Sequence, residues 1–192
     1  MQPFWFNYQG MNSIENLKNK RITGERIYLR KIRKSDLPAC VRWLSDPDVT
    51  KFLSDSVKDV TGEQELEWFN FIYSSPNDMV FAVVAKKDRI YIGNCGLHKI
   101  DWQQKTCEFG IFIGEQSYWD KGYGTEATRA IIDFVFKNLK LEKIRLLVYE
   151  YNPRAIKVYR DCGFVIEDVL KKDHLYNNIY WDTYAMEYKN GG

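Results

Sequence analysis

The sequence predicts a single domain of the α+β class, and two features of the chain lead to this prediction. Three strand-like runs, over residues 79–85, 90–98 and 106–113, follow one another with only short polar joints between them. Joints this short connect antiparallel neighbours, so the three runs form a meander. Around the meander, stretches with apolar residues at helical spacing alternate with further strands. With 192 residues, of which 45% are hydrophobic, the chain can bury one sizeable core.

One strand and two helices are predicted ahead of the meander. Residues 26–32 alternate between apolar and polar side chains, as a half-buried strand does. A helix is expected to start at Ser35, which is a capping residue type, and to end before Pro47. A second helix is expected to begin at Thr61 and to end near Pro76.

After the meander, the pattern predicts helix, strand, helix and two closing strands. Apolar residues at helical spacing run over residues 122–138, and a β-rich run follows at 143–149. Residues 152–163 begin with an N-cap asparagine and a proline and end at a glycine, as a helix does. The closing strands are expected over residues 164–170 and 179–188, with the polar stretch 171–178 between them.

These elements make a sheet of about seven strands flanked by four helices. All of them lie within residues 26–188, which are therefore expected to form one domain. Residues 1–25 are expected to be an N-terminal tail or extension with little order.

Composition and charge exclude several classes of protein. The 28 basic and 26 acidic residues leave a formal net charge of +2, which argues against a dedicated nucleic-acid binder. No apolar run is long enough to span a membrane, and the N-terminus lacks a signal-peptide pattern. The four cysteines are then expected to be reduced thiols in a cytoplasmic protein. Neither histidine belongs to a metal-binding pattern, although a nucleophilic pair such as Cys107 with His174 stays open.

The segment with the clearest chemistry has two glycines, Gly122 and Gly124, at the start of a predicted helix. Glycines let the backbone turn tightly and approach a ligand, and the free amides of a helix N-terminus favour phosphate. A Walker A loop is excluded because it needs Lys and then Ser or Thr directly after its glycine. A dinucleotide-binding loop would match the glycines, but such a loop follows its strand directly, whereas residues 114–121 intervene here.

Two motifs resemble the GNAT N-acetyltransferase superfamily. The segment WDKGYGTEA, over residues 119–127, is similar to the family's loop for the pyrophosphate of acetyl-CoA, and NPRAIKVYRDCGF, over residues 152–164, to its fourth-helix motif. Trp119 in the first loop position looks like the ribosomal-protein N-terminal acetyltransferase branch (RimJ/RimL-like). The resemblance covers residues 26–188 and implies the GNAT fold, with a mixed, mostly antiparallel twisted sheet. It also implies an N-acetyltransferase that uses acetyl-CoA as co-substrate.

The same resemblance implies which residues bind the co-substrate. Backbone amides near the end of the strand 106–113 would hold the pantetheine arm and polarise the acetyl carbonyl. The residues expected to contact acetyl-CoA are Ile111, Phe112, Ile113, Trp119, Lys121, Gly122, Tyr123, Gly124, Thr125, Asn152 and Ala155.

Two residues are expected to move protons. An ammonium group is not a nucleophile, so a base must take its proton, and Glu108 is the candidate because family members often have a glutamate there. Tyr159 is expected to donate a proton to the leaving thiolate as general acid. Plainer interpretations stay open: Glu108 as an exposed strand residue, and Tyr159 as packing between helix and sheet. Gly110 is expected to mark a bulge that opens the strand towards the thioester.

Charge is unevenly distributed, which bears on the acceptor. Residues 121–157 have eight basic and four acidic side chains, which suits a polyanionic nucleotide, whereas residues 44–67 have seven acidic side chains and two lysines. The acidic stretch favours a cationic acceptor, or is only a solvated helical face. The expected acceptor is a protein N-terminal amine, and a polyamine or an aminoglycoside is the alternative. The candidates to line its pocket, or to pack in the core, are Trp43, Phe52, Trp68 and Phe69.

Two further expectations concern partners and activity. Homodimers are common in the family, so a homodimer is among the expected assemblies. A sensor module that binds acyl-CoA without catalysis is the rival interpretation from another class of protein.

Overall fold

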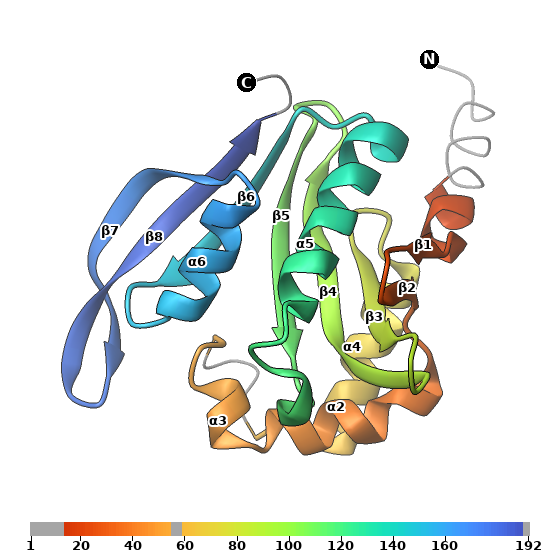
Figure 1. Cartoon of the computed structure of the whole chain (residues 1–192), viewed down its shortest axis with the longest axis horizontal. Coiled ribbons are helices and arrows are strands. Elements are labelled where there is room, and N and C mark those ends of the chain that lie inside the picture. The colour runs from red at the N-terminus through yellow and green to blue at the C-terminus, as the bar shows by residue number, and fades with distance from the viewer. Residues whose placement is uncertain (1–13, 55–58, 190–192) are drawn as a thin grey trace, which may run out of the picture.

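The computed structural model describes residues 14–54 and 59–189, and one eight-stranded sheet runs through this part of the chain. The strands lie in the order β1-β2-β3-β4-β5-β6-β8-β7 (Figure 1). Every neighbouring pair is antiparallel except β5 and β6, which are parallel. The strands are β1 (Ile22–Thr23), β2 (Ile27–Lys31), β3 (Met79–Ala85), β4 (Ile90–Asp101), β5 (Thr106–Ile113), β6 (Lys143–Tyr149), β7 (Val165–Tyr176) and β8 (Ile179–Lys189).

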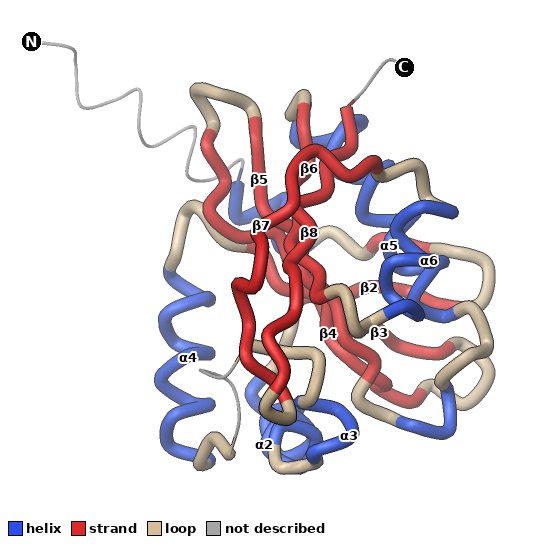
Figure 2. The backbone as a smooth tube through the Cα atoms, turned by 90° about the vertical axis from the view of Figure 1, so that its left-hand side faces the viewer, coloured by secondary structure: helices blue, strands red, loops and turns tan. Residues whose placement is uncertain are grey.

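Helices cover both faces of the sheet. Helix α4 lies on one face and helices α5 and α6 lie on the other, while α2 and α3 close one end of the molecule (Figure 2). None of the helices within the described ranges is long and apolar enough to cross a membrane. The helices are α2 (Leu37–Leu44), α3 (Pro47–Thr50), α4 (Gly62–Ser74), α5 (Tyr123–Phe134) and α6 (Pro153–Asp161), with the 3-10 turns η1 (Lys34–Asp36) and η3 (Gln116–Tyr118) and the π-turn η4 (Val135–Leu139).

Each face of the sheet has its own hydrophobic core. The larger core lies between the sheet and helices α5 and α6, where Phe81 of β3 meets Phe134 of α5 edge to face, with ring centroids 5.6 Å apart. The smaller core includes Cys40 of α2 and Phe69 of α4. Because both faces are covered, all seven residues of β3 are buried. The predicted mostly antiparallel α+β fold is confirmed, with eight strands where about seven were expected.

The predicted strands at 79–85, 106–113 and 143–149 match β3, β5 and β6 residue for residue. Their hydrophobic patterns are strong because each strand lies inside the sheet, between two partners. The expected start of α4 is also confirmed, since Thr61 caps this helix in a capping box with Gln64.

Several boundaries differ from the prediction. Ser35 does not cap the first helix but lies in η1, and α2 begins at Leu37. Pro47 does not end helical structure; it opens α3, and Asp46 caps this helix by accepting a hydrogen bond from the Asp48 amide (2.9 Å). β7 continues to Tyr176, so the polar stretch expected as a joint belongs mostly to the β7–β8 hairpin. Two asparagines at positive φ, residues 177 and 178, make its tight turn, a geometry that asparagine tolerates.

The segment expected to be a tail is folded from residue 14 onward. Residues 14–19 are helical, Ile14 and Leu17 pack against the larger core, and β1 pairs with β2. Apolar side chains in this short stretch have a place to pack that its sequence alone did not reveal. Residues 1–13 lie outside the described residues, and the domain boundary at residue 26 stays a prediction.

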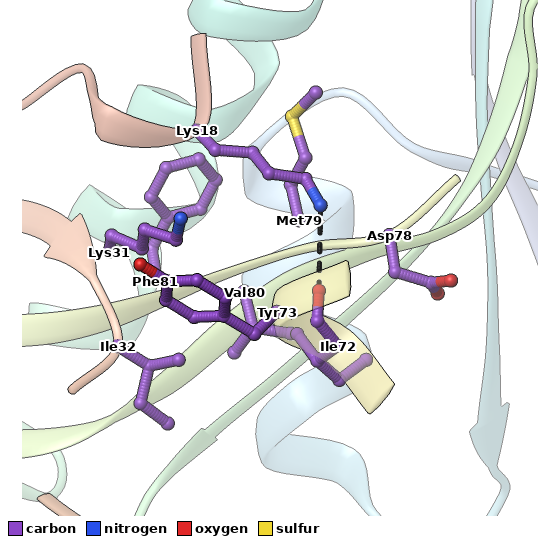
Figure 3. Close-up of a pocket in the computed structure, with 9 residues that line it drawn as sticks. All are labelled: Lys18, Lys31, Ile32, Ile72, Tyr73, Asp78, Met79, Val80 and Phe81. Carbon is purple, nitrogen blue, oxygen red and sulfur yellow. Dashed lines mark hydrogen bonds between the residues drawn. The ribbon is translucent and has the colours of Figure 1, made fainter. Parts of the chain in front are cut away.

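Lys18 anchors this N-terminal helix to the end of α4. Its ammonium group donates hydrogen bonds to the carbonyl oxygens of Ile72 (3.4 Å, Figure 3) and Ser75. The last carbonyls of a helix have no donor within the helix, so the lysine acts as a C-terminal cap. Burial lowers the pKa of Lys18, and the side chain is 5% exposed.

A buried carboxylate, Glu187 on β8, ties β6 to β8. Its side chain is 4% exposed and lies 3.1 Å from both Lys143 Nζ and Arg145 Nε, and 2.8 Å from Lys189 Nζ. Burial alone would raise the pKa of Glu187, but hydrogen bonds from these three cations outweigh burial and lower the pKa from 4.5 to about 2. The Glu187 carboxyl group therefore binds a proton less tightly in the folded state than in the unfolded chain.

We expect Glu187→Gln to lower Tm at pH 7 by about 2–8 °C, because three cations lose their anion. Two of these cations are half exposed, so water screens them and the loss of stability is limited to ~1–2 kcal/mol. The higher stability of the wild type is fully present above pH 4.5, and it disappears as the pH falls towards the folded-state pKa of about 2. Thermal unfolding of both proteins between pH 7 and pH 3 measures it. The control is Glu167→Gln, which removes only an exposed contact of 3.6 Å to Lys189. Equal Tm values for wild type and Glu187→Gln at pH 7 would contradict the expectation.

Candidate functional site

β5 and β6 diverge in the middle of the sheet (Figure 1). Their parallel pairing is limited to the positions from Thr106↔Lys143 to Glu108↔Arg145. From residue 109 onward, β5 keeps β4 as its partner on one side and has no pairing with β6 on the other, both strands being fully described. The polar backbone groups along that edge are available to an extended ligand.

The divergence corrects the expectation of a bulge at Gly110. Gly110 pairs in register with Gly96, and the register of β4 with β5 continues unbroken from Gly93↔Ile113 to His98↔Glu108. Separation of β5 from β6 opens the sheet instead. A Cβ atom added at Gly110 would have no heavy atom within 4 Å, so there is open space above this glycine.

Helix α5 begins with amide groups that no side chain caps. Its N-cap, Gly122, has φ +79°, a left-handed conformation that glycine adopts without strain. The first intrahelical bond runs from the Glu126 amide to the Gly122 carbonyl (3.0 Å), which leaves the amides of Tyr123, Gly124 and Thr125 without an acceptor among the described residues. Three free amides at the positive end of a helix dipole form an anion site.

This anion site lies against the end of the unpaired strand edge. A Cβ at Gly124 would have Ile113 Cγ1 as its nearest neighbour, at 4.0 Å. The Trp119 indole N–H donates to the Ile113 carbonyl (2.6 Å) and so holds the loop against β5. The backbone of Ile111, Phe112 and Ile113, expected to hold the pantetheine arm, thus leads directly to the amides expected to hold phosphate.

The side chains of Lys121 and Tyr123 contact the protein. Lys121 Nζ donates to the Ser117 carbonyl (2.7 Å), and the Tyr123 ring packs edge to face on Tyr118 at 5.2 Å. These contacts shape the loop that presents the free amides. Contacts of the two side chains with the co-substrate stay predictions.

Asn152 caps helix α6. Its side-chain oxygen accepts a hydrogen bond from the Ala155 amide (3.1 Å), and the side chain is buried. The amide nitrogen of this side chain has no hydrogen-bond acceptor within the described part of the chain, so its two N–H donors are free. The cap is the plainer interpretation of Asn152, and the contact of Asn152 and Ala155 with the co-substrate stays a prediction.

Tyr159 lies above the point where β5 leaves β6. Its ring packs edge to face on Phe109 of β5, with centroids 6.4 Å apart, and on Phe164 at 5.8 Å. The residue is 6% exposed, and burial raises the pKa of its hydroxyl above the usual value of 10. No hydrogen-bond partner for this hydroxyl is present among the described residues. A protonated hydroxyl with a free proton is what a general acid requires.

Glu108 lies on the opposite face of the sheet. Its neighbours Cys107 and Phe109 point into the core beneath α5 and α6, so Glu108 points towards the face that carries α2 and α4. Its side chain is 49% exposed and forms an ion pair with Lys99 (3.0 Å). The candidate base and the candidate acid are therefore on opposite faces, at the same divergence of the strands.

The alternative pair of Cys107 and His174 is excluded. Cys107 is buried in the larger core, and burial raises the pKa of its thiol to about 12. His174 lies on β7 and stacks on Tyr149, with ring centroids 4.1 Å apart. β6 and β8 lie between β5 and β7, which alone separates the two residues by roughly 14 Å, and His174 pairs with Trp181, seven residues along β8 from Tyr188 opposite Cys107, so they lie still further apart.

Of the four aromatic residues proposed for the acceptor pocket, Phe52 is partly buried and packs on an aromatic ring, and its place in a pocket stays a prediction. Its ring lies 5.7 Å from that of Tyr151, whose hydroxyl donates to the Lys51 carbonyl (2.9 Å). Tyr151 stacks on Tyr149 in turn, at 5.3 Å and an interplanar angle of 6°. The other three residues pack in the core or against it, as the plainer interpretation had it: Trp43, Trp68 and Phe69.

Sequence reasoning missed Arg26 as a residue that shapes the site. Its Nε donates to Glu126 Oε2 (3.0 Å) and its Nη1 to the Lys121 carbonyl (2.9 Å), which fastens the loop to α5 and to the start of β2. No local pattern could reveal this contact, because its partners lie about a hundred residues further along the chain.

These features define a site that would suit an extended, phosphate-bearing ligand along the free edge of β5. Residues 26–165 match the model of the acetyltransferase (GNAT) domain, and the chain therefore belongs to the GNAT acetyltransferase family. It is an acyltransferase that uses acetyl-CoA, and the GNAT fold inferred from the two motifs is confirmed.

Several relatives are similar over most of the chain. The uncharacterized N-acetyltransferase p20 of Bacillus licheniformis is 30% identical over 149 residues, which cover 77% of this chain and 83% of that protein. A spermidine N(1)-acetyltransferase of Vibrio cholerae is 33% identical over 104 residues, 54% of this chain and 60% of that one. The crystal structure of a GNAT acetyltransferase from Bacillus anthracis has a TM-score of 0.76 at 27% identity, covering 88% of this chain and 98% of that one.

Proposed function

We propose that the chain transfers an acetyl group directly to a primary amine, with Glu108 as base and Tyr159 as acid. Bound acetyl-CoA would supply the thioester. Glu108 takes a proton from the ammonium group on the α2–α4 face, directly or through water, and Tyr159 gives one to the thiolate on the α5–α6 face. The observation that carries this proposal is the divergence of β5 and β6, which opens the sheet between the two side chains.

We further propose a small cationic amine, of the polyamine class, as the acceptor. Glu65 on α4 is 5% exposed and has no cationic partner among the described residues, and burial raises the pKa of its carboxyl group. Glu65 contacts Cys40, and Cys40 contacts Asn94 of β4, which pairs with Phe112 of β5. The Glu65 carboxyl group therefore lies on the α2–α4 face, the same face as Glu108. A buried carboxylate without a counter-ion is costly, and a cationic acceptor would offset that cost.

The similarity to a spermidine N(1)-acetyltransferase supports the same class. A protein N-terminal amine is the second candidate, and the observation that favours it is Trp119 in the first position of the phosphate loop. The two candidates differ in the number of positive charges that the acceptor carries close to the reacting nitrogen.

An acetyl-CoA turnover screen over spermidine, an aminoglycoside and short peptides with free N-termini tests the proposal. We expect spermidine to have the highest kcat/KM, and Glu65→Gln to raise the KM for spermidine with the KM for acetyl-CoA unchanged. Glu67→Gln, which changes an exposed residue of the same helix, is the matched control. Peptides as the best substrates would establish the second candidate. Acetyl-CoA binding without turnover of any amine would favour the sensor.

A further inference from the structure

Three titratable side chains lie in a row on the α2–α4 face, across the start of β3, β4 and β5. His98 of β4 is paired with Glu108 of β5. On its other side, His98 Nδ1 lies 3.0 Å from Oδ1 of Asp78, the residue directly before β3. Residues paired across neighbouring strands face the same side of a sheet, so His98 shares the face of the candidate base. The row places an imidazole ring between two carboxyl groups.

The Asp78 carboxylate orients the imidazole ring. Its Oδ2 accepts a hydrogen bond from Ser75 Oγ (2.6 Å), and its Oδ1 faces His98 Nδ1. An ionised carboxylate only accepts hydrogen bonds, so Nδ1 carries a hydrogen and Nε2 of the neutral ring has the free lone pair. No hydrogen-bond partner of Nε2 is present among the described residues. The ring is therefore ready to accept a proton at Nε2.

The charged groups around His98 come from three neighbouring segments. Asp78 precedes β3, and Glu108 on β5 is paired with Lys99, which follows His98 on β4 (3.0 Å). Lys18 of the N-terminal helix interacts with the charge of Asp78. Of these groups, only Asp78 contacts the imidazole ring directly.

Nε2 lies beside the open part of the sheet. A Cβ atom added at Gly96 would be 2.7 Å from His98 Nε2, so the ring lies over this glycine. Gly96 pairs with Gly110, which has open space above it and lies where β5 has left β6. The His98 side chain is 35% exposed, so water and a small substrate can reach it.

The proposed reaction removes two protons from the acceptor nitrogen. A primary ammonium group has three hydrogens, and the amide nitrogen of the product has one. The first proton leaves before the nitrogen attacks, and the second leaves once the nitrogen is bonded to the acetyl carbon. Glu108 holds one proton at a time, so a second acceptor on the same face would complete the sequence.

We propose that His98 Nε2 takes the second proton. As the C–N bond forms and the C–S bond breaks, this proton moves from the nitrogen to Nε2, and Tyr159 gives its proton to the thiolate sulfur. His98 then loses its proton to water and Tyr159 regains one, so the net proton released is the one that Glu108 removed. The inference rests on the proposed direct transfer to a primary amine and does not depend on which amine it is.

Chemical rescue of a variant without the imidazole ring tests the proposal. We expect His98→Ala to lower kcat by roughly 10²-fold or more, with the Kd for CoA unchanged. Added imidazole should restore part of the turnover, and more of it near pH 8 than near pH 6, because only neutral imidazole accepts a proton. The control is His174→Gln, which changes the second of the two histidines, on β7, and should keep the wild-type kcat.

Gly96→Ala is a second variant, which keeps the histidine and displaces its ring. The added methyl group would lie 2.7 Å from Nε2, so the ring must move away from its place beside Gly110. We expect a lower kcat, an unchanged Kd for CoA and no rescue by imidazole, because the methyl group and the displaced ring fill the space. If His98→Ala does not bind CoA, this variant decides the question.

The outcomes separate this inference from the proposed function. A wild-type kcat in His98→Ala, or a loss that imidazole does not restore, would overturn the role of His98 and leave the transfer to an amine in place. If His98→Ala does not bind CoA, a wild-type kcat in Gly96→Ala would overturn it. Turnover of no amine by the wild-type protein would overturn both.

Discussion

Replacing Tyr159 by Phe is expected to lower kcat by roughly 10²–10⁴-fold, the usual contribution of a positioned general acid. The thiolate that leaves the thioester needs a proton, and the Tyr159 hydroxyl has no other acceptor among the described residues. Because burial raises the pKa of Tyr159, the hydroxyl stays protonated at physiological pH. Steady-state kinetics with the best amine of the screen measures the loss, and CoA titration shows whether the co-substrate still binds.

The substitution keeps the ring, so its packing on Phe109 and Phe164 is retained. We therefore expect Tm and the Kd for CoA to stay at their wild-type values, which separates a chemical role from a packing role. A tyrosine ordinarily loses its proton near pH 10, but burial raises the pKa of Tyr159. In the wild type, kcat should therefore not decline near pH 10 through loss of this proton. Unchanged turnover in Tyr159→Phe would remove Tyr159 from the mechanism and leave it as a core residue.

Replacing Glu108 by Gln is expected to reduce kcat/KM by roughly 10²-fold or more, and most strongly at low pH. At low pH nearly all of the amine is protonated, so the reaction then depends most on a group that removes the proton. The pH–rate profile of the variant should fall more steeply on its acidic side than that of the wild type. Measuring kcat/KM for the amine across the pH range at saturating acetyl-CoA checks this expectation.

A matched control exists for Glu108. Glu142 is also an exposed glutamate paired with a lysine, with Oε1 2.6 Å from Lys105 Nζ, and it lies outside the diverging part of the strands. Glu142→Gln should leave the pH–rate profile unchanged. A profile for Glu108→Gln that has the wild-type shape would rule Glu108 out as the base, and the Lys99–Glu108 pair would then be an ordinary surface ion pair.

Local sequence patterns were sufficient for β3, β5 and β6 and for the glycine turn that opens α5. β3, β5 and β6 each lie between two partners, so burial imposes a continuous or alternating apolar pattern that can be read directly. Caps are equally local: Thr61 with Gln64 and Asn152 with Ala155 are contacts over three residues. For the same reason, the glycines at the start of α5 indicated an anion site before any fold was known.

Contacts between segments far apart in the chain could not be read in this way. The N-terminal helix looked like a tail because its anchors, Ile72 and Ser75, lie more than fifty residues away. Arg26 reaches Glu126 from a hundred residues away, and no pattern links the two.

By itself, the sequence determined an α+β domain of the GNAT family with a glycine turn that opens a helix, because propensity, periodicity and capping act over a few residues. Only the tertiary structure decided that Glu108 and Tyr159 lie on opposite faces where β5 leaves β6, that Gly110 marks open space without a bulge, and that the His98 ring lies over Gly96. The physical reason is that strand order and helix placement follow from burying two cores at once, which depends on the whole chain.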